Sequence, residues 1–277
     1  MTEPDRPDWN SFARANASER WKKLSAAMGG DVTRALVTQA RITPGLTVLD
    51  VASGTGEPAI SIACAMNGTG SVIATDISEG PLKIAQQRAK QRELTNIEFQ
   101  KADAMALPFG DVSFDRITSR LGVMFFPDPR KAVQEFHRVL KPRGQVTLLA
   151  WGSIDQPYFA TTVGTVQRLL EKPFPESGKK MFKFADPQSL RTLYEEAGFA
   201  EINVRSVDVD WTWPGSPEDL WDYFQDVTVP FKPLLDAIPA ERKSEVDAEV
   251  IREISRYSDG KQIAFSASIV LATALKT

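Results

Sequence analysis

The chain is poor in the residues that build disulfides, metal clusters and histidine-based active sites. It has one cysteine, Cys64, and one histidine, His137, among 277 residues. A single cysteine excludes an intramolecular disulfide and a cysteine-cluster zinc site, so no metal is expected. The apolar neighbours of Cys64 favour a small buried thiol over a nucleophile. His137 falls inside an expected helix, which makes it a poor candidate for a general base.

Two further absences bear on location and partners. No apolar run approaches the roughly 18 residues that would span a membrane, and residues 1–8 are polar, so neither a span nor a signal peptide is expected. The net charge is only −3, and no basic stripe is visible, which argues against nucleic acid as a partner. The composition therefore predicts a cytoplasmic protein, and it leaves the oligomeric state open.

The order of the expected elements predicts an α/β fold. Short apolar strands alternate with helices from about residue 40 to 151, which favours a parallel sheet with helices on both faces. The expected strands are residues 47–51, 71–75, 97–101, 114–119, 145–151, 200–213 and 262–275. The expected helices are residues 57–67, 79–93, 129–140 and 189–197, with a helical stretch over 217–257 and a long connection over 152–187.

The most informative stretch joins an apolar strand to a helix through two glycines. Asp50 ends the apolar run of the strand, and Gly54 and Gly56 follow. Glycine allows positive φ and leaves the main chain bare, so a ligand can lie against it. Pro58 favours a helix start at that point. Asp76 ends the next strand at a spacing typical of an acid that accepts hydrogen bonds from a ribose diol.

A missing third glycine indicates which nucleotide-type cofactor fits this loop. The dinucleotide fingerprint would place glycines at positions 52, 54 and 57, where the chain has Ala52, Gly54 and Glu57. A pyrophosphate would sit at the helix N-terminus, where Glu57 would repel it, with Asp50 adding a second negative charge. The same two carboxylates favour an ammonium. The loop therefore favours a cofactor that has a ribose and an amino-acid ammonium and lacks a phosphate, and S-adenosylmethionine has these properties.

These residues resemble the first motif of the class I S-adenosylmethionine-dependent methyltransferases, in which an acid and a small residue precede two spaced glycines. Asp103 and the stretches 107–115 and 135–144 resemble the later motifs of that family, in the right order. The resemblance covers about residues 45–151 and is closest to the methyltransferases of ubiquinone and menaquinone synthesis. Ser53, often cysteine there, and Arg143, usually glycine, depart from the pattern without affecting the implied function.

The resemblance implies a Rossmann-like, seven-stranded, mostly parallel sheet with an antiparallel C-terminal edge hairpin and a helical lid. Residues 1–39 would form N-terminal lid helices. Residues 40–277 would form the cofactor-binding domain, with lid insertions at about 152–186 and 216–258. By the same resemblance, Asp103 accepts the adenine amino group, the N–H of Ala104 reaches a ring nitrogen, and Ile77 packs on the ring. The implied cofactor-binding residues are Asp50, Ala52, Ser53, Gly54, Gly56, Asp76, Ile77, Asp103, Ala104, Met105 and Ser119.

The density of aromatic side chains in the expected lid predicts a small, largely apolar or aromatic methyl acceptor. The predicted acceptor-contacting residues are Trp21, Arg120, Trp221 and Phe224, with Trp9 and Phe12 as further rings of the N-terminal helices. The alternative is that these rings only join the lid to the core and that Arg120 is exposed beside the crevice. No catalytic residue is singled out, and Tyr158, Tyr194, Tyr223 and the carboxylates of the lid are equal candidates for a base.

The expected reaction is an in-line SN2 transfer of a methyl group from a sulfonium to an O, N, C or S nucleophile, in which the protein mainly positions the reactants. Three alternatives stay open. A nucleotide-dependent oxidoreductase is disfavoured by Ala52, Glu57 and the missing glycine. A non-catalytic S-adenosylmethionine-binding protein is excluded only by turnover. A nucleic-acid or protein methyltransferase is disfavoured by the acidic net charge and by a lid that suggests a closed pocket.

Overall fold

The computed structural model describes residues 27–277, which divide into two compact units. The sheet unit comprises residues 33–151, 183–207 and 269–277. The helical unit comprises, within the described part, residues 27–32, 152–182 and 208–268. Trp9, Phe12 and Trp21 lie outside the described residues, and so do most of the predicted N-terminal lid helices.

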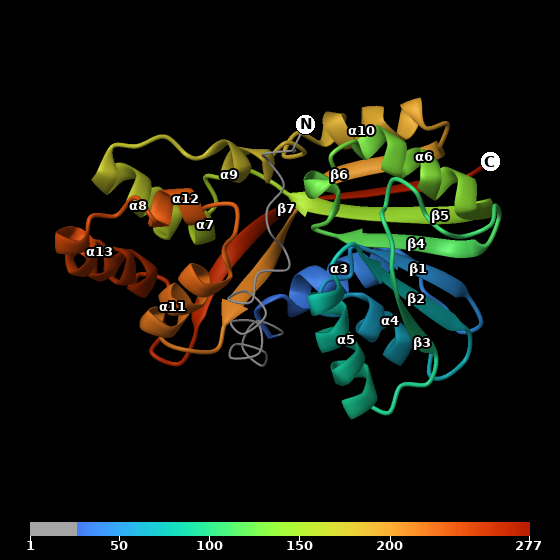
Figure 1. The fold of residues 1–277 in the computed structure, drawn as a ribbon, viewed down its shortest axis with the longest axis horizontal. Coiled ribbons are helices and arrows are strands. Elements are labelled where there is room, and N and C mark those ends of the chain that lie inside the picture. Colours follow the sequence, from blue (N-terminus) through green and yellow to red (C-terminus); the bar gives the residue numbers. More distant parts are fainter. Residues whose placement is uncertain (1–26) are drawn as a thin grey trace. The chain divides into compact units, whose positions relative to one another are not determined.

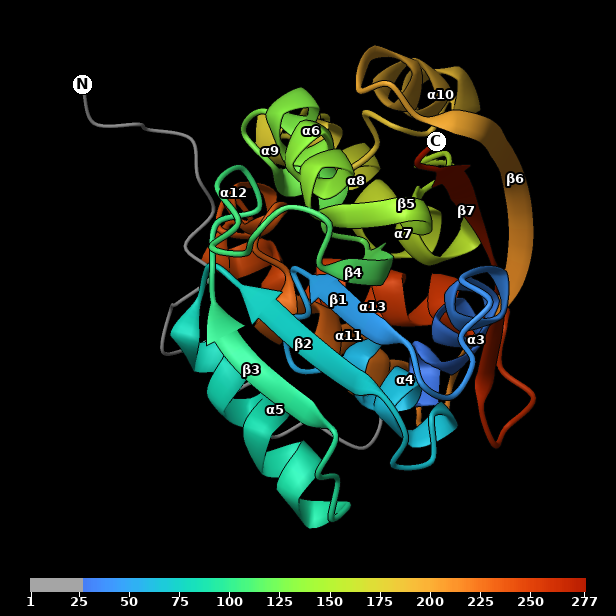
Figure 2. The ribbon, with the colours of Figure 1, turned by 90° about the vertical axis from the view of Figure 1, so that its right-hand side faces the viewer.

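Seven strands form one sheet in the order β3-β2-β1-β4-β5-β7-β6 (Figures 1 and 2). The strands are β1 Thr47–Val51, β2 Ser71–Asp76, β3 Ile97–Lys101, β4 Phe114–Arg120, β5 Leu140–Trp151, β6 Ala200–Trp213 and β7 Ile263–Leu275. The pairs β1–β2, β1–β4, β2–β3 and β4–β5 are parallel, while β7 runs antiparallel to β5. The predicted sheet, mostly parallel with its C-terminal strands at an antiparallel edge, is confirmed.

Helices cover both faces of this sheet (Figure 1). α4 Ala59–Ala65 and α5 Glu79–Gln91 pack against β2 and β3, and α6 Pro129–Val139 packs against β5 and α10 Pro187–Glu196. α6 and α10 begin where an aspartate caps the first turn and a proline occupies the first helical positions, two strong helix-start signals. α3 Gly30–Gln39 precedes β1, and the 3-10 turn η1 Val123–Phe125 follows β4.

The shorter α4 corrects one detail of the sequence reading. Glu57 and Pro58 belong to the turn before the helix, and α4 buries Ala59, Ile60, Ile62 and Ala63 against the sheet. Cys64 falls outside that buried stripe and is exposed. The prediction of a buried thiol was wrong, because a helix turns successive residues away from one another and an apolar run does not say which residue faces the core.

The helical unit contains more helices than the sequence predicted. They are α7 Pro157–Thr161, α8 Val163–Leu170, α9 Glu176–Lys180, α11 Pro217–Val227, α12 Lys232–Leu235, the 3-10 turn η2 Ala240–Arg242 and α13 Lys243–Ser255. The connection expected over 152–187 therefore contains α7, α8 and α9. The stretch expected over 217–257 is split where Pro233 and Pro239 start new segments. Among the described helices, none has the length and apolar character needed to cross a bilayer.

Candidate cofactor site

The glycine loop, residues 53–57, is held against the ends of β1 and β2 by main-chain hydrogen bonds. The N–H of Ser53 donates to the carbonyl oxygen of Thr75 at 2.9 Å. The N–H of Gly54 donates to Asp76 Oδ2 at 2.9 Å, and the N–H of Ser78 donates to Asp76 Oδ1 at 2.9 Å. Asp76 therefore fixes the loop, and its carboxylate oxygens are acceptors of the kind that a diol can donate to.

The two glycines of the loop serve different purposes. Gly56, at φ +111°, packs so tightly that a Cβ there would lie 2.5 Å from Ile60 Cδ1 and 3.1 Å from Ala85 Cβ. Gly54, at φ +55°, is open: no atom of the described residues lies within 4 Å of an added Cβ. Gly56 is thus required by packing, whereas Gly54 presents bare main chain to whatever lies beside the loop.

Ala52 adopts a glycine-like backbone although it carries a side chain. Its φ is 58°, in the left-handed region. It lies beside the end of β4, because a Cβ added to Gly122 would come within 2.7 Å of Ala52 Cβ and 2.6 Å of Ser119 Oγ. At position 52 the chain therefore has a side chain where the dinucleotide fingerprint has glycine, but its backbone adopts a positive φ of the kind that glycine favours.

Asp50 is a buried acid at the end of β1. Thr118 donates from Oγ1 to Asp50 Oδ1 at 2.6 Å, while Oδ2 is buried and makes no full hydrogen bond within the described residues. Burial raises the pKa of Asp50 to about 7, and the Glu57 charge adds to that rise. The Thr118 hydroxyl, the Arg120 charge and the Ala59 N–H act in the opposite direction. A carboxyl poised near neutrality responds strongly to any cation brought close to it.

The acid predicted on the adenine side also lies at this edge of the sheet. The N–H of Ala102 donates to the carbonyl oxygen of Asp76 at 3.0 Å, which joins the ends of β2 and β3. Asp103 Oδ1 accepts from the N–H of Met105 at 2.9 Å, and Ala104 between them is buried. Ile77 is 43% exposed and offers an apolar surface next to Asp76.

Ser119 and Arg120 end β4, next to β1. Ser119 is fully buried, and within the described residues its hydroxyl has no hydrogen-bond partner. The guanidinium of Arg120 donates from Nη1 to Thr33 Oγ1 at 2.7 Å and lies close enough to Asp50 to influence its charge. The residues predicted to hold the cofactor from β1, β2, β3 and β4 thus all lie at the carboxyl ends of adjacent parallel strands, where open α/β sheets bind ligands.

Two predicted acceptor contacts lie in the aromatic cluster of the helical unit. The rings of Trp221 and Phe224 stack with centroids 5.9 Å apart, and Trp221 Nε1 donates to Asp247 Oδ1 at 2.7 Å, joining α11 to α13. Both rings are almost fully buried. The ring of Tyr158 makes edge-to-face contacts with the rings of Phe224 and Trp211, with centroids 5.7 Å apart in both pairs. That these rings contact an acceptor, and that the unit forms a lid, stay predictions.

The candidate bases can be compared by their surroundings. Burial raises the pKa of Tyr158 well above 10, and Tyr223 nearby raises it further, so the Tyr158 hydroxyl keeps its proton at neutral pH. Tyr194 is buried in the sheet unit, where its hydroxyl donates to the carbonyl oxygen of Ala272 at 3.3 Å. His137 packs edge-on against the ring of Phe199, away from the loop residues. Tyr194 and His137 thus have other partners within the sheet unit, and the identity of a base stays a prediction.

Sequence reasoning missed the partner of Glu57. Its carboxylate accepts from Arg88 Nη2 at 2.9 Å and from Ser61 Oγ at 2.6 Å. The negative charge that was expected to act on a ligand is therefore largely compensated by Arg88. The signal in the sequence is slight, because Arg88 is one of several cations on α5 and only the fold brings it to the loop.

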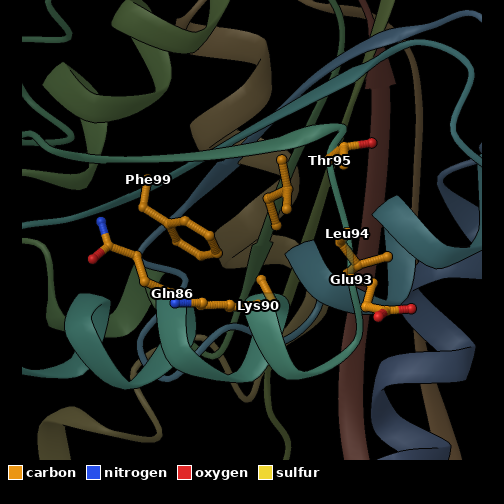
Figure 3. Close-up of a pocket in the computed structure, with 8 residues that line it drawn as sticks. Gln86, Lys90, Glu93, Leu94, Thr95 and Phe99 are labelled. Atoms are coloured by element: carbon orange, nitrogen blue, oxygen red, sulfur yellow. The ribbon is translucent and has the colours of Figure 1, made fainter.

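A separate groove lies at the outer edge of the sheet, between α5 and β3 (Figure 3). Gln86 and Lys90 of α5 point toward it, opposite Phe99 of β3, and Leu94 and Thr95 close one end. The groove shares no lining residue with the glycine loop or with Asp50, Asp76 and Asp103. It is distinct from the cofactor site.

Comparison with known proteins agrees with this geometry. The model of the ubiE/COQ5 methyltransferase family matches residues 28–209. A demethylmenaquinone methyltransferase of Staphylococcus epidermidis is 32% identical over 69% of this chain and 85% of its own length. One of Lactiplantibacillus plantarum is 29% identical over 73% of this chain and 86% of its own length.

A solved structure of an Aquifex aeolicus SAM-dependent methyltransferase has the same fold, with a TM-score of 0.57 and 16% identity over 94% of this chain and 98% of that one. The cyclase SpnF shares the fold with a TM-score of 0.55 and 19% identity, over 98% of each chain. The fold by itself therefore accommodates more than one reaction.

Proposed function

The chain belongs to the ubiE/COQ5 methyltransferase family, and from this premise we propose that it transfers the methyl group of S-adenosylmethionine to a small, largely apolar aromatic acceptor. The observation that carries the assignment of the site is the open face of Gly54 beside Asp76. An unobstructed main-chain segment next to a carboxylate suits a ligand that has a ribose and an extended methionine chain.

The residues at the strand ends fit this cofactor. Asp76 would accept hydrogen bonds from the ribose hydroxyls, and Gly54 would lie along the methionine portion. Asp50 Oδ2 and Ser119 Oγ are buried polar atoms whose hydrogen-bonding capacity is not used within the described residues. Such atoms are costly to leave unsatisfied, and an ammonium or carboxylate of the ligand would compensate them.

The reaction places modest chemical demands on the protein. When bound, S-adenosylmethionine supplies an already activated methyl group on a sulfonium. The protein's contribution is then to hold an acceptor in line and to exclude water. Asp50 would hold negative charge near the cofactor's ammonium. Arg120, which donates to Thr33, lies close enough to Asp50 to favour its charged form.

The acceptor is proposed from the helical unit and from the relatives together. Tyr158, Trp211 and Phe224 form an aromatic cluster that suits a flat apolar molecule. The relatives from Staphylococcus epidermidis and Lactiplantibacillus plantarum are both named demethylmenaquinone methyltransferase. The family match ends at residue 209, however, before α11, α12 and α13. A demethylated quinone is therefore the first acceptor to test, and the chain's own helices set the final selectivity.

The raised pKa of Asp50 predicts pH-dependent cofactor binding. Below about pH 7 the carboxyl is protonated and neutral, so it loses its attraction for the ligand's ammonium. Affinity for S-adenosylhomocysteine should fall as pH decreases through that value, by up to about tenfold for each pH unit. Calorimetric titration across the pKa of Asp50 measures this. Asp50→Asn should bind more weakly and show a flat profile, and a wild-type profile as flat as that of Asp50→Asn would refute the role.

Turnover tests the function itself. The purified full chain, incubated with S-adenosylmethionine and reduced demethylmenaquinone, should form S-adenosylhomocysteine, a proton and a product in which a methyl group replaces one hydrogen atom. Both organic products are detected by mass spectrometry. Calorimetry should show binding of S-adenosylhomocysteine and none of NADH, which separates the proposal from an oxidoreductase. Methylation of smaller aromatic hydroxyl compounds but not of the quinone would support the proposed class of acceptor and exclude the quinone as its member. Cofactor binding with no methylation of either kind of acceptor would contradict the proposal.

A further inference from the structure

We propose that Arg88 on α5 is a positioning residue for the cofactor, because it fixes the conformation of the glycine loop from the helix side. The proposal rests on the assignment of the cofactor to this loop. Arg88 lies 33 residues from Thr55 along the chain, and its side chain is only 9% exposed. It is thus a buried cation on a helix, and it needs a structural reason to be there.

The contacts of the guanidinium are divided between main chain and side chain. Nη1 donates to the carbonyl oxygen of Thr55 at 2.5 Å, and Nη2 donates to Glu57 Oε1 at 2.9 Å. The shorter bond goes to the loop's backbone and not to the carboxylate. The planar fork of arginine can bind both acceptors at once, which a lysine ammonium cannot do with the same geometry.

Thr55 is the residue at which the loop most needs an outside restraint. It lies between Gly54 and Gly56, both at positive φ, and glycine permits more backbone conformations than any other residue. The N–H groups of Ser53, Gly54 and Gly56 are held by Thr75, Asp76 and Ser53 in turn. The bond from Arg88 holds the Thr55 carbonyl, so the Thr55–Gly56 peptide plane is restrained on both sides, by Arg88 at its carbonyl and by Ser53 at its N–H.

Glu57 completes the arrangement. Its second oxygen accepts from Ser61 Oγ at 2.6 Å, and its side chain is only 14% exposed. Arg88 therefore neutralises a mostly buried carboxylate in the turn before α4 while it anchors the loop. No described atom lies within 4 Å of a Cβ added at Gly54, so the methionine portion of the cofactor would meet a preformed, open surface and would not have to order the loop itself.

A double substitution separates positioning from simple ion-pair stability. Arg88→Met leaves Glu57 unpaired and should lower the Tm by about 5 °C or more. It should also weaken S-adenosylhomocysteine binding by about tenfold or more, because the loop loses its anchor. In Arg88→Met/Glu57→Gln the uncompensated charge is gone, so most of the Tm should return. The affinity should stay about tenfold below wild type, since the Thr55 carbonyl still lacks its donor.

The matched control is Lys90→Met, which removes a cation from the exposed, groove-facing side of the same helix (Figure 3). It should leave both the Tm and the affinity unchanged. In turnover, the double variant should raise the KM for S-adenosylmethionine and change kcat far less. The proposal is overturned if affinity recovers together with Tm in the double variant, or if Arg88→Met binds at wild-type affinity. Loss of binding in Asp76→Ala alongside normal binding in the Arg88 variants would reject only the role of Arg88.

Discussion

Gly54→Val should abolish detectable binding of S-adenosylmethionine and S-adenosylhomocysteine while the sheet stays folded. Gly54 has φ +55° and open space around its Cα, so the added side chain would project into the place proposed for the ligand. A β-branched residue in the left-handed region also costs about 1–2 kcal/mol of backbone strain. Binding is measured by calorimetry, and folding by circular dichroism and thermal unfolding.

Gly45→Val provides the matched control for that experiment. Gly45 lies in the turn before β1, also at positive φ (+89°) and with no described atom within 4 Å of an added Cβ. It carries comparable backbone strain but lies outside the glycine loop. Gly45→Val should lose stability to a similar extent and keep its affinity for the cofactor. Normal binding by a folded Gly54→Val protein would mean that the cofactor does not lie along this loop.

Asp76→Ala should weaken cofactor binding by roughly ten- to a hundredfold, because a charge-assisted hydrogen bond to a diol is lost. The structure adds a second consequence. Asp76 also accepts from the N–H groups of Gly54 and Ser78, so its removal leaves two donors without their acceptor and should lower the Tm as well. Calorimetry and thermal unfolding on the same preparation measure the two effects.

Asp76→Asn separates these effects, since the amide keeps one acceptor oxygen and loses the charge. It should restore part of the Tm and little of the affinity. Glu79→Ala removes a nearby acid that pairs with Lys101 in an exposed salt bridge, and it should alter neither quantity beyond experimental error. An unchanged affinity in folded Asp76→Ala would remove Asp76 from the cofactor site.

The sheet was predictable because each strand carries its own local signal. Residues 47–51 and 97–101 match β1 and β3 at both ends, and β2 and β4 extend only one residue beyond the expected ranges. Buried parallel strands are short apolar runs bounded by turn residues, so their limits are visible in the sequence. β5 starts earlier than expected, at Leu140, since Arg143 adopts φ 64° and lets the chain pair on both sides of an irregularity opposite β4.

The parts that were missed depend on contacts between distant segments. No local pattern shows that Arg88 reaches Thr55 and Glu57, because several residues of α5 are cationic and the choice of partner is tertiary. The exposure of Cys64 likewise depends on which side of α4 meets the sheet. The short helices α7 and α9 have five residues each, too few for a periodic signal. Asp50, by contrast, lies near the end of β1, where the sequence indicates it, but its elevated pKa could not be predicted because it results mainly from burial in the folded chain.

The position of β7 in the sheet has a consequence for biosynthesis. β7 begins at Ile263, yet it pairs with β5, which ends at Trp151. During translation from the N-terminus, β5 is made before most of the helical unit, and β7, its second neighbour in the sheet, is made after it. An unpaired strand edge with apolar residues such as Val146 and Leu148 is a template for association with other chains. The yield of folded protein should therefore be more sensitive to synthesis conditions than its final stability indicates.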